Sequence, residues 1–330
     1  MTLTPGQVRN WKRYAETSPL YMRLTDVIAD DDRLRDILSR IENPPPHNLL
    51  FGGVQYLMLR DGPVELGRFY PNFTDSPLDP KGVDQPFTEF VLEHAEELVA
   101  IGNTRRTQTN ECRRCVAILP AVWMTPASRF HLVDFGASAG LNLNLDRYRY
   151  EWGDVGWGPD SSVVLRTENR GEGFEPRPVE ILSRVGLDLD PIDPTDADAR
   201  MWLEALVWPE HHDRRQRLLA ALEIAALHPP RLVPGDALAS LGPTLDSLPE
   251  GDPVVVINSF ILNQFPHETR GRVGDVVREA RGWRPVYRVS VEWLSKTDEA
   301  ATIAVDDGTG LRVVGMTQPH GEWIEFYARP

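Results

Sequence analysis

The sequence contains few cysteines, no long apolar segment and no excess of basic residues, and each shortage excludes a class of protein. Only 2 of its 330 residues are cysteines, which excludes a disulfide-stabilised secreted fold. They form the pair Cys112-x-x-Cys115, interpreted as two small apolar residues one helical turn apart or, alternatively, as a reactive thiol pair beside two arginines. No stretch approaches the roughly 20 apolar residues that span a bilayer. The first residues, 1–6, do not resemble a secretion signal. We therefore predict a cytoplasmic protein that does not bind membranes.

The charge balance argues against a nucleic-acid partner. Acidic residues outnumber basic ones by 49 to 35, giving a net charge of −14, and the basic residues are scattered along the chain. A surface for a phosphate backbone needs clustered positive charge. A small-molecule or protein substrate is the expected partner, whereas the oligomeric state is not indicated. The chain can bury one large core or two ordinary ones, and we favour two.

Helical periodicity dominates the first part of the chain. Apolar residues recur every three to four positions in five segments, and a sixth, more apolar helix follows the polar segment 105–111. The sequence predicts a helical N-terminal cap domain over 1–127. Its predicted helices are 8–15, 20–29, 31–41, 49–60, 87–101 and 116–122.

From residue 128 onward strand-like and helical segments alternate, which is typical of an α/β fold with a parallel sheet. We predict a second domain over 128–330 with a β-hairpin insertion near 148–178. A hairpin turn at 306–310 joins the predicted strands 301–305 and 311–316, and one more strand follows them. The predicted strands are 131–135, 179–187, 231–233, 253–258, 284–291, 301–305, 311–316 and 323–328, and the predicted helices are 198–206, 213–227 and 268–281.

The most informative segment is 131–142, where an apolar run leads into Gly136-Ala137-Ser138-Ala139-Gly140 and then into leucine-spaced sequence. This pattern predicts a strand, a tight loop and a helix start, whose N–H groups can bind an anion. With Asp134 before it, the loop resembles the first motif of S-adenosylmethionine-dependent methyltransferases, with Ser138 replacing the usual middle glycine. The same residues match the G-x-S-x-G nucleophile elbow of serine hydrolases.

The hydrolase interpretation needs more than the elbow. A triad could be written as Ser138, Asp236 and either His267 or His320. A hydrolase elbow follows several strands, however, and no strand is predicted before residue 131. The methyltransferase interpretation is therefore preferred, and the hydrolase stays a less favoured alternative.

The methyltransferase resemblance implies roles for acidic residues at successive strand ends. An acidic side chain at the end of the second strand holds the ribose hydroxyls in such sheets, and Asp188 is the candidate. It lies 54 residues after Asp134 rather than the usual ~20, and the predicted hairpin insertion absorbs the excess. The resemblance thus implies a complete cofactor site. For the methionine part, Asp134 holds the loop or the ammonium group, and the carboxylate binds the N–H groups of Gly136, Ala137, Ser138 and Gly140. For the nucleoside part, Asp188 binds the ribose and Asp236 and Ala237 border the adenine, while Asn110 adds a contact from the cap.

The fourth strand, 254–258, is followed by an amide-rich and aromatic loop at the edge where such sheets bind ligands. Asn258, Asn263 and Gln264 are candidates to orient a nucleophile or bind substrate. His267 or Glu292 could accept its proton. Alternatively, the amides satisfy loop backbone groups and His267 caps the next helix. No metal site is indicated.

Five short motifs also resemble a bacterial family of unknown function, whose sheet domain looks like the class I methyltransferase fold. The resemblance implies a Rossmann-like seven-stranded methyltransferase-type sheet with an all-helical N-terminal domain. S-adenosylmethionine is the expected cofactor of a methyltransferase acting on a small molecule or protein; the alternative is a non-catalytic nucleotide- or ligand-binding protein of the same fold. The motifs are Ser18-Pro19-Leu20-Tyr21, Gln108-Thr109-Asn110-Glu111, the segment 136–143, Tyr148-x-Tyr150 and Val207-Trp208-Pro209.

Overall fold

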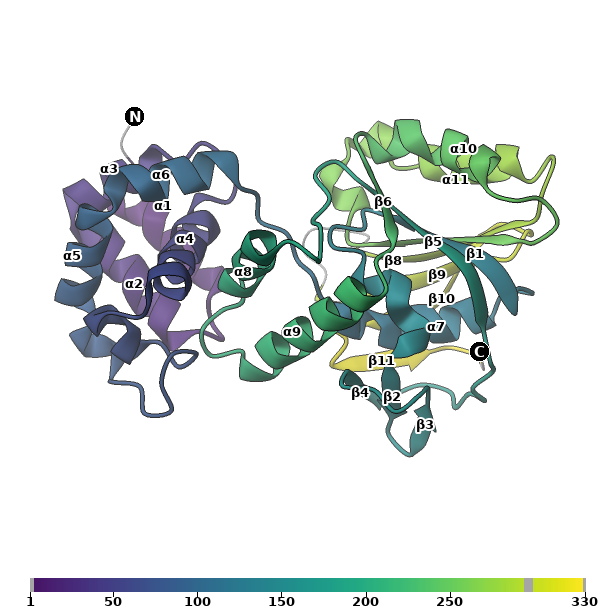
Figure 1. The fold of residues 1–330 in the computed structure, drawn as a ribbon, viewed down its shortest axis with the longest axis horizontal. Coiled ribbons are helices and arrows are strands. Elements are labelled where there is room, and N and C mark those ends of the chain that lie inside the picture. The colour runs from purple at the N-terminus through teal and green to yellow at the C-terminus, as the bar shows by residue number, and fades with distance from the viewer. Residues whose placement is uncertain (1–2, 294–298, 329–330) are drawn as a thin grey trace. The chain divides into compact units, whose positions relative to one another are not determined.

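The structure is a computed structural model that describes residues 3–293 and 299–328 (Figure 1). The described residues divide into a unit built from helices and a unit built around a sheet. The helical unit consists of those within 1–109 and 197–216, and the sheet unit consists of those within 110–196 and 217–330.

The observed boundary differs from the one expected at 127/128. The segment 110–127 belongs to the sheet unit, because the helix within it packs against strands. The segment 197–216 belongs to the helical unit although it lies far along the chain, because Trp202 and Ala205 are part of that unit's apolar core.

The helices predicted at 20–29, 31–41 and 49–60 are present, whereas the segment 8–15 contains the end of a short α-helix and then a 3₁₀ helix over Asn10–Tyr14. Ser18 and Asp31 cap two of them with their side chains, as their residue types favour. The predicted helix 87–101 is divided at His94, whose ring nitrogen Nδ1 lies 3.0 Å from the Phe90 carbonyl oxygen. The elements of the helical unit are α1 (Pro5–Arg9), η1 (Asn10–Tyr14), α2 (Pro19–Asp30), α3 (Asp32–Ser39), α4 (Pro46–Asp61), η2 (Glu65–Phe69), η3 (Pro80–Gly82), α5 (Asp84–Glu93), α6 (Ala95–Thr104) and α8 (Ala197–Ala205), where η marks a 3₁₀ helix.

A buried glutamine connects the core of the helical unit. The amide nitrogen of Gln55 lies 2.7 Å from the Tyr21 hydroxyl, 2.8 Å from the Ala205 carbonyl oxygen and 3.0 Å from that of Val207. Its amide oxygen accepts a hydrogen bond from Asn72. Since buried polar groups are costly unless they are paired, this network fixes α4 against α2 and the segment after α8.

The sheet unit contains one sheet, in the order β3-β2-β4-β11-β10-β9-β8-β7-β1-β5-β6. The strands β6, β5, β1, β7 and β8 are parallel, as the sequence predicts, and in chain order they run 3-2-1-4-5 across the sheet. The pairs from β8 to β11 are antiparallel. The strands are β1 (Arg129–Phe135), β2 (Arg149–Trp152), β3 (Val155–Trp157), β4 (Val164–Asn169), β5 (Glu180–Asp188), β6 (Arg231–Pro234), β7 (Val254–Ser259), β8 (Val286–Glu292), β9 (Ala301–Asp306), β10 (Leu311–Thr317) and β11 (Trp323–Phe326).

The described sheet has eleven strands where seven were expected. The predicted hairpin exists, since β2 and β3 pair in antiparallel fashion. It does not stand apart from the sheet, because β4 pairs in parallel with β2 on one side and with β11 on the other. The insertion therefore extends the sheet at the end opposite β6.

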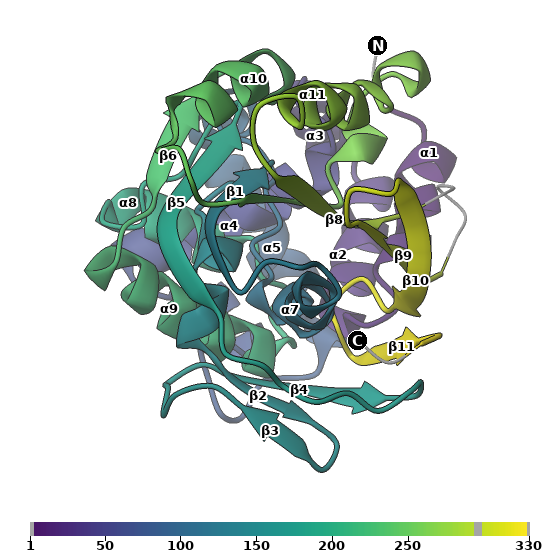
Figure 2. The ribbon, with the colours of Figure 1, turned by 90° about the vertical axis from the view of Figure 1, so that its right-hand side faces the viewer.

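The two faces of the sheet are covered differently. Helices α10 (Ala237–Ser247) and α11 (Arg272–Ala280) pack on one face with the apolar side chains of β1, β5 and β7. On the other side the sheet curves around α7 (Cys115–Trp123), as Figure 2 shows. All nine residues of α7 are buried, as expected for a helix that is apolar all round. A long helix, α9 (His212–Leu227), precedes β6.

Two local predictions were wrong. The segment after the glycine loop is a 3₁₀ helix, η5 (Leu141–Arg147), with a kink at Asn144 rather than an α-helix. Helix α10 was not predicted, because it contains Gly242 and Pro243, which normally interrupt helices. Of the helices in the described ranges, none combines the length and the apolar character that crossing a membrane requires.

Candidate functional site

The candidate site lies where the five parallel strands end, an edge that we call the carboxyl edge. The chain leaves β1 for β5 and β6 on one side and later forms β7 and β8 on the other, so the strand order reverses between β1 and β7. Sheets of this type bind ligands at such a switch point. The carboxyl edge consists of Asp134, Gly136–Gly140, Asp188, Gly235–Asp236, Asn258–Ile261 and Glu292.

The glycine loop has an unusual backbone. Gly136, Ser138 and Gly140 have φ of +90°, +49° and +69°. A Cβ at Gly136 would lie 2.6 Å from the Ile261 side chain, so glycine is required there for close approach as well as for its φ. Ser138 holds a left-handed conformation that residues other than glycine seldom adopt. This strained position marks the loop as a functional candidate.

The N–H groups of the loop already donate hydrogen bonds to acceptors within the protein. We had expected them to bind the carboxylate of the cofactor. The N–H groups of Gly136 and Ala137 both donate to the Leu187 carbonyl, at 2.8 and 3.1 Å, and that of Gly140 donates to the Ala137 carbonyl. That of Ser138 donates to Asp188 Oδ2 at 2.7 Å. An anion at this loop would therefore have to displace bonds within the protein.

Asn110 holds the loop from the other side. Its Oδ1 accepts from the Ala139 N–H at 3.1 Å, and its Nδ2 donates to Ser138 Oγ at 3.0 Å. Asn110, in the polar segment 105–111, therefore faces the glycine loop. Asn110 is 9% exposed, and its contacts keep Ser138 in its strained conformation.

Asp188 and Asp236 follow the second and third strands, as expected, and both bond to backbone. Asp188 accepts from the N–H groups of Ser138 and Asp190. Asp236 is exposed and caps α10, its Oδ1 accepting from the N–H groups of Leu238 and Ala239. Ala237, which begins α10, is buried.

Asp134 is the least compensated charge at the carboxyl edge. It is 1% exposed, and within the described residues neither carboxylate oxygen has a hydrogen-bond partner. Burial, reinforced by the charge of Asp188, raises the pKa of Asp134 to about 7. Arg114 and the Asn142 amide act in the opposite direction and less strongly. The group is thus partly ionised at neutral pH.

Glu292 and Asn258 form a second buried polar cluster at the ends of β8 and β7. Glu292 Oε1 accepts from Asn258 Nδ2 at 2.9 Å and from the Ile261 and Leu262 N–H groups. Its Oε2 is buried and has no hydrogen-bond partner in the part of the chain that the structure describes. Burial raises the pKa of Glu292. Asn258 Oδ1 in turn accepts from Arg288 Nε at 2.9 Å, so Asn258 is a positioning residue for Glu292.

The remaining predicted residues lie on the loop between β7 and α11. Asn263 is half-buried, and Gln264 and His267 are exposed, in two short 3₁₀ helices. His267 does not cap α11, because the N-cap residue of that helix is Gly271. Among the described residues, none of these three side chains forms a hydrogen bond with the buried cluster, so their roles stay predictions.

Sequence reasoning missed Arg114. It lies at the N-terminal end of α7, with its guanidinium carbon 4.3 Å from the centre of the Phe260 ring. Phe260 follows β7 and has a φ of +55°. The positive charge of Arg114 lowers the pKa of both Asp134 and Glu292. The only signal in the sequence was its place in the Cys112-x-x-Cys115 pair, and those cysteines are free and buried, with burial raising the pKa of both thiols.

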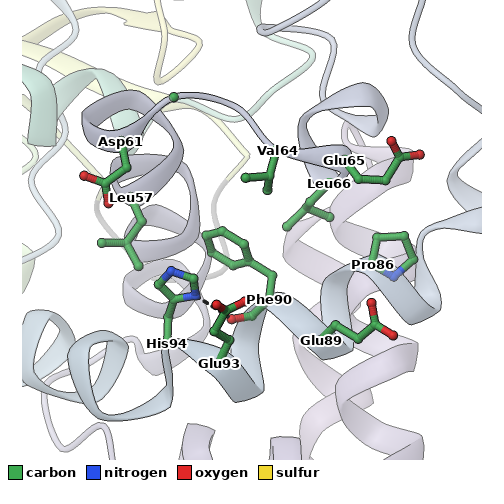
Figure 3. Close-up of a pocket in the computed structure, with 11 residues that line it drawn as sticks. Leu57, Asp61, Val64, Glu65, Leu66, Pro86, Glu89, Phe90, Glu93 and His94 are labelled. Carbon is green, nitrogen blue, oxygen red and sulfur yellow. Dashed lines mark hydrogen bonds between the residues drawn. The ribbon is translucent and has the colours of Figure 1, made fainter.

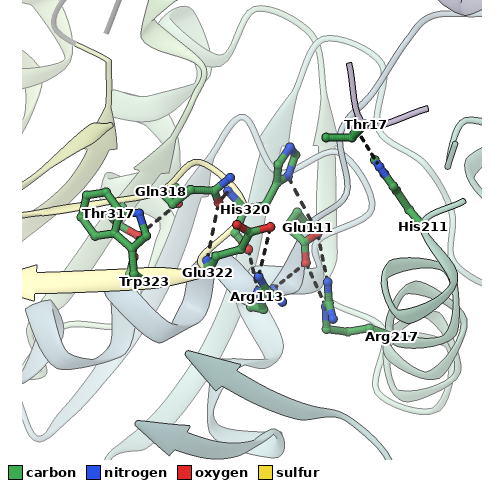
Figure 4. Close-up of polar contacts among 10 residues, drawn as sticks. All are labelled: Thr17, Glu111, Arg113, His211, Arg217, Thr317, Gln318, His320, Glu322 and Trp323. Carbon is green, nitrogen blue, oxygen red and sulfur yellow. Dashed lines mark hydrogen bonds and ion pairs between the residues drawn. The ribbon is translucent and has the colours of Figure 1, made fainter. Parts of the chain in front are cut away.

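The residues of the alternative serine triad have other contacts. The Ala139 N–H, which would contribute to an oxyanion hole, donates to Asn110, and Asp236 caps α10. His320 lies beside the buried Glu111, which also pairs with Arg217 at 3.1 Å (Figure 4). Within the part of the chain that the structure describes, the alternative triad is therefore not assembled around Ser138.

A separate cavity of about 330 Å³ lies within the helical unit (Figure 3). Its floor is apolar, with Leu57, Leu66 and Phe90, and carboxylates such as Asp61 and Glu93 stand around it. None of the residues predicted from the sequence as site residues lines it.

Comparison with known proteins identifies a family but no activity. A family model described as an uncharacterized protein conserved in bacteria (DUF2332) matches residues 9–326. Neither curated proteins nor solved structures gave a match to the chain.

Proposed function

Because the chain belongs to this uncharacterized bacterial family, whose description names no reaction, we propose a function from the site itself. The protein binds S-adenosylmethionine at the carboxyl edge and transfers its methyl group to a small-molecule or protein acceptor. The 3-2-1-4-5 order of the parallel strands supports a methyltransferase-type sheet, to which the insertion adds further strands.

One observation carries the proposal: among the described residues no donor meets hydrogen-bond geometry with the buried carboxylate of Asp134, and Arg114 and the Asn142 amide offset its burial only in part. An unpaired buried carboxylate is costly, and a cationic ligand compensates it. S-adenosylmethionine carries positive charge on its sulfonium and its ammonium groups. Asp134 is thus the residue to hold the cationic part of the cofactor.

The glycine loop distinguishes this cofactor from nucleotides that carry phosphates. Pyrophosphate-binding loops present free N–H groups to the anion. Here the N–H groups from Gly136 to Gly140 donate within the protein. A ligand with a positive centre therefore fits better than NAD or ATP. Loop residues Gly136, Ala137, Ser138 and Gly140 would contact the cofactor through packing.

Two acidic side chains retain free acceptor capacity for the nucleoside. Each carboxylate oxygen of Asp188 accepts one backbone N–H hydrogen bond. Since a carboxylate accepts about four hydrogen bonds, Asp188 can also bind the ribose hydroxyls. Asp236 uses Oδ1 for its helix cap, which leaves Oδ2 for the adenine amino group beside Ala237. Asn110 would act by holding the loop.

Catalysis would depend mainly on positioning, because bound S-adenosylmethionine supplies an already activated methyl group. The chain must place the acceptor and remove its proton. Glu292 suits this role, since its pKa is raised and its buried Oε2 has no hydrogen-bond partner among the described residues. Asn258 fixes its orientation. Asn263, Gln264 and His267 remain candidates for contacts with the acceptor.

Isothermal titration of the purified protein tests the proposal. Wild-type protein should bind S-adenosylmethionine and S-adenosylhomocysteine but not ATP or NAD. Asp134→Asn should weaken binding of S-adenosylmethionine at least tenfold. Asp190→Asn, which changes an exposed aspartate nearby, is the matched control and should bind as the wild type does.

Three other outcomes would redirect the interpretation. Binding without methyl transfer to any acceptor in a bacterial extract, tested with methyl-labelled cofactor, would favour a non-catalytic ligand-binding protein. Labelling of Ser138 by a fluorophosphonate would favour the hydrolase. Tighter binding of NAD or ATP than of S-adenosylmethionine would contradict the charge argument.

A further inference from the structure

Because the N–H groups of the glycine loop already donate hydrogen bonds within the protein, a carboxylate on the ligand needs another donor. The expected donors around Gly136–Gly140 bond to Leu187, Asp188, Asn110 and Ala137. A carboxylate without a donor would meet only the repulsion of Asp134 and Glu292. The ligand's negative group therefore requires a cation at the carboxyl edge.

Arg114 has the required position. Its guanidinium lies over the ring of Phe260, which directly follows β7, and β7 pairs with β1 beside Asp134. The N–H of Phe260 donates to the Val291 carbonyl at 3.0 Å, and that of the next residue, Ile261, donates to Glu292. Arg114 therefore lies at the same edge of the sheet as the two carboxylates. Arginine stays charged at any physiological pH and presents a planar set of donors that matches a carboxylate. Stacking on Phe260 holds that plane in place.

We propose that Arg114 binds the carboxylate of the ligand's α-amino-acid group while Asp134 binds its ammonium. The carboxyl edge would then recognise a zwitterionic head with two opposite charges. This inference rests on the proposed function and adds a specificity: ligands that keep the amino-acid head bind, and those without its carboxylate bind more weakly.

The adjacent arginine provides a matched control. Arg113 Nε donates to the His320 carbonyl at 2.8 Å, and its guanidinium lies 3.8 Å from Glu322 (Figure 4). Arg113 therefore fixes the turn between β10 and β11, to which Arg114 also donates through its Nε, 3.4 Å from the Pro319 carbonyl oxygen. Removing its charge alters the net charge as much as removing that of Arg114, but it leaves the proposed carboxylate contact in place.

The test compares two ligands by titration calorimetry: S-adenosylmethionine and its decarboxylated derivative. Wild-type protein should bind the intact ligand at least tenfold more tightly. Arg114→Met keeps an apolar side chain against Phe260, and it should weaken binding of the intact ligand about tenfold or more while leaving the decarboxylated one nearly unchanged. Arg114→Lys should show a smaller loss, and Arg113→Met should retain the wild-type preference. Unchanged melting temperatures verify that the variants fold.

The outcomes separate this inference from the proposed function. If wild-type protein binds both ligands equally, or if Arg114→Met weakens both equally, Arg114 does not read the carboxylate, although S-adenosylmethionine binding stands. If wild-type protein binds neither ligand, the proposed function fails and the inference fails with it.

Discussion

Both units bury polar atoms that have no hydrogen-bond partner among the described residues, but carboxylate oxygens are among these atoms only in the sheet unit. In the helical unit they include His47 Nε2 and the Tyr70 hydroxyl, both uncharged at neutral pH. At the carboxyl edge of the sheet unit they include both carboxylate oxygens of Asp134 and the Oε2 atom of Glu292. Neutral groups cost little to bury compared with an ionised carboxylate. The helical unit is therefore organised for packing, whereas the sheet edge retains charge that stability alone would not favour.

The largest effect should come from the packed network of the helical unit. Gln55→Leu removes the contacts to Tyr21, Asn72 and two backbone carbonyls, and it leaves those groups buried without a partner. We expect a loss of about 3 kcal/mol in the free energy of unfolding, measured in urea, and no change in ligand affinity. Gln85→Leu, at an exposed position, should change stability by less than about 0.5 kcal/mol. If Gln55→Leu and Gln85→Leu lowered the free energy of unfolding equally, the buried network would not stabilise the helical unit.

His47 gives the helical unit its own pH dependence. Burial against Trp11 lowers the pKa of His47 to about 4 from 6.5, so the unfolded chain binds a proton more readily. The stability from this residue is complete above pH 6.5 and is lost as the pH falls toward 4, by about 3 kcal/mol. His47→Phe should remove that acid sensitivity, whereas His228→Gln, at an exposed site, should keep it. Parallel pH profiles for wild type and His47→Phe would contradict this.

Asp134 should show the opposite pH dependence. Its pKa of about 7 lies above the unfolded value of 3.8, so its contribution to stability is complete below pH 3.8 and is lost as the pH rises through 7. Asp134→Asn should therefore stabilise the protein at pH 8 and much less at pH 4, which thermal unfolding at the two pH values measures. Asp146→Asn should instead destabilise it at pH 8, because Asp146 pairs with Arg184 at 2.7 Å. A stabilised Asp134→Asn that still binds ligand normally would mean that the charge has no role in binding.

Two substitutions of Asp236 should distinguish its role as a helix cap from its proposed contact with the adenine, with smaller effects than those above. Asp236→Ser keeps a capping oxygen, so stability should stay within about 0.5 kcal/mol while affinity for S-adenosylmethionine falls. Asp236→Ala should lose about 1 kcal/mol of stability as well. If the serine variant binds as the wild type does, Asp236 is a helix cap and does not contact adenine.

The sequence predicted the elements better than their assembly. Alternating segments identified the parallel strands, because buried strands and amphipathic helices leave different periods in the sequence. The extension of the sheet by β4 could not be predicted, since it depends on pairing with β11, more than 150 residues away. Helix α10 was missed because its burial against β1 and β5 outweighs the breaking tendency of Gly242 and Pro243.

The site shows the same limit. Strand ends located Asp134, Asp188 and Glu292 at one edge, because carboxyl ends of parallel strands meet there. The use of the loop N–H groups by Leu187 and Asn110 could not be read from the sequence, because it depends on how residues distant in the chain approach the loop. The same holds for Arg114, whose relevance comes from its stacking on Phe260.

Proton exchange on ligand binding tests the central claim, that the carboxyl edge keeps Asp134 to hold a positive charge. S-adenosylmethionine would be titrated into the protein at pH 7 in buffers of different ionisation enthalpy, for the wild type and for Asp134→Asn. A cation beside a half-protonated Asp134 lowers its pKa, so the wild type should release up to about half a proton per site, and the variant none. Proton uptake by the wild type, or release unchanged in the variant, would contradict the account.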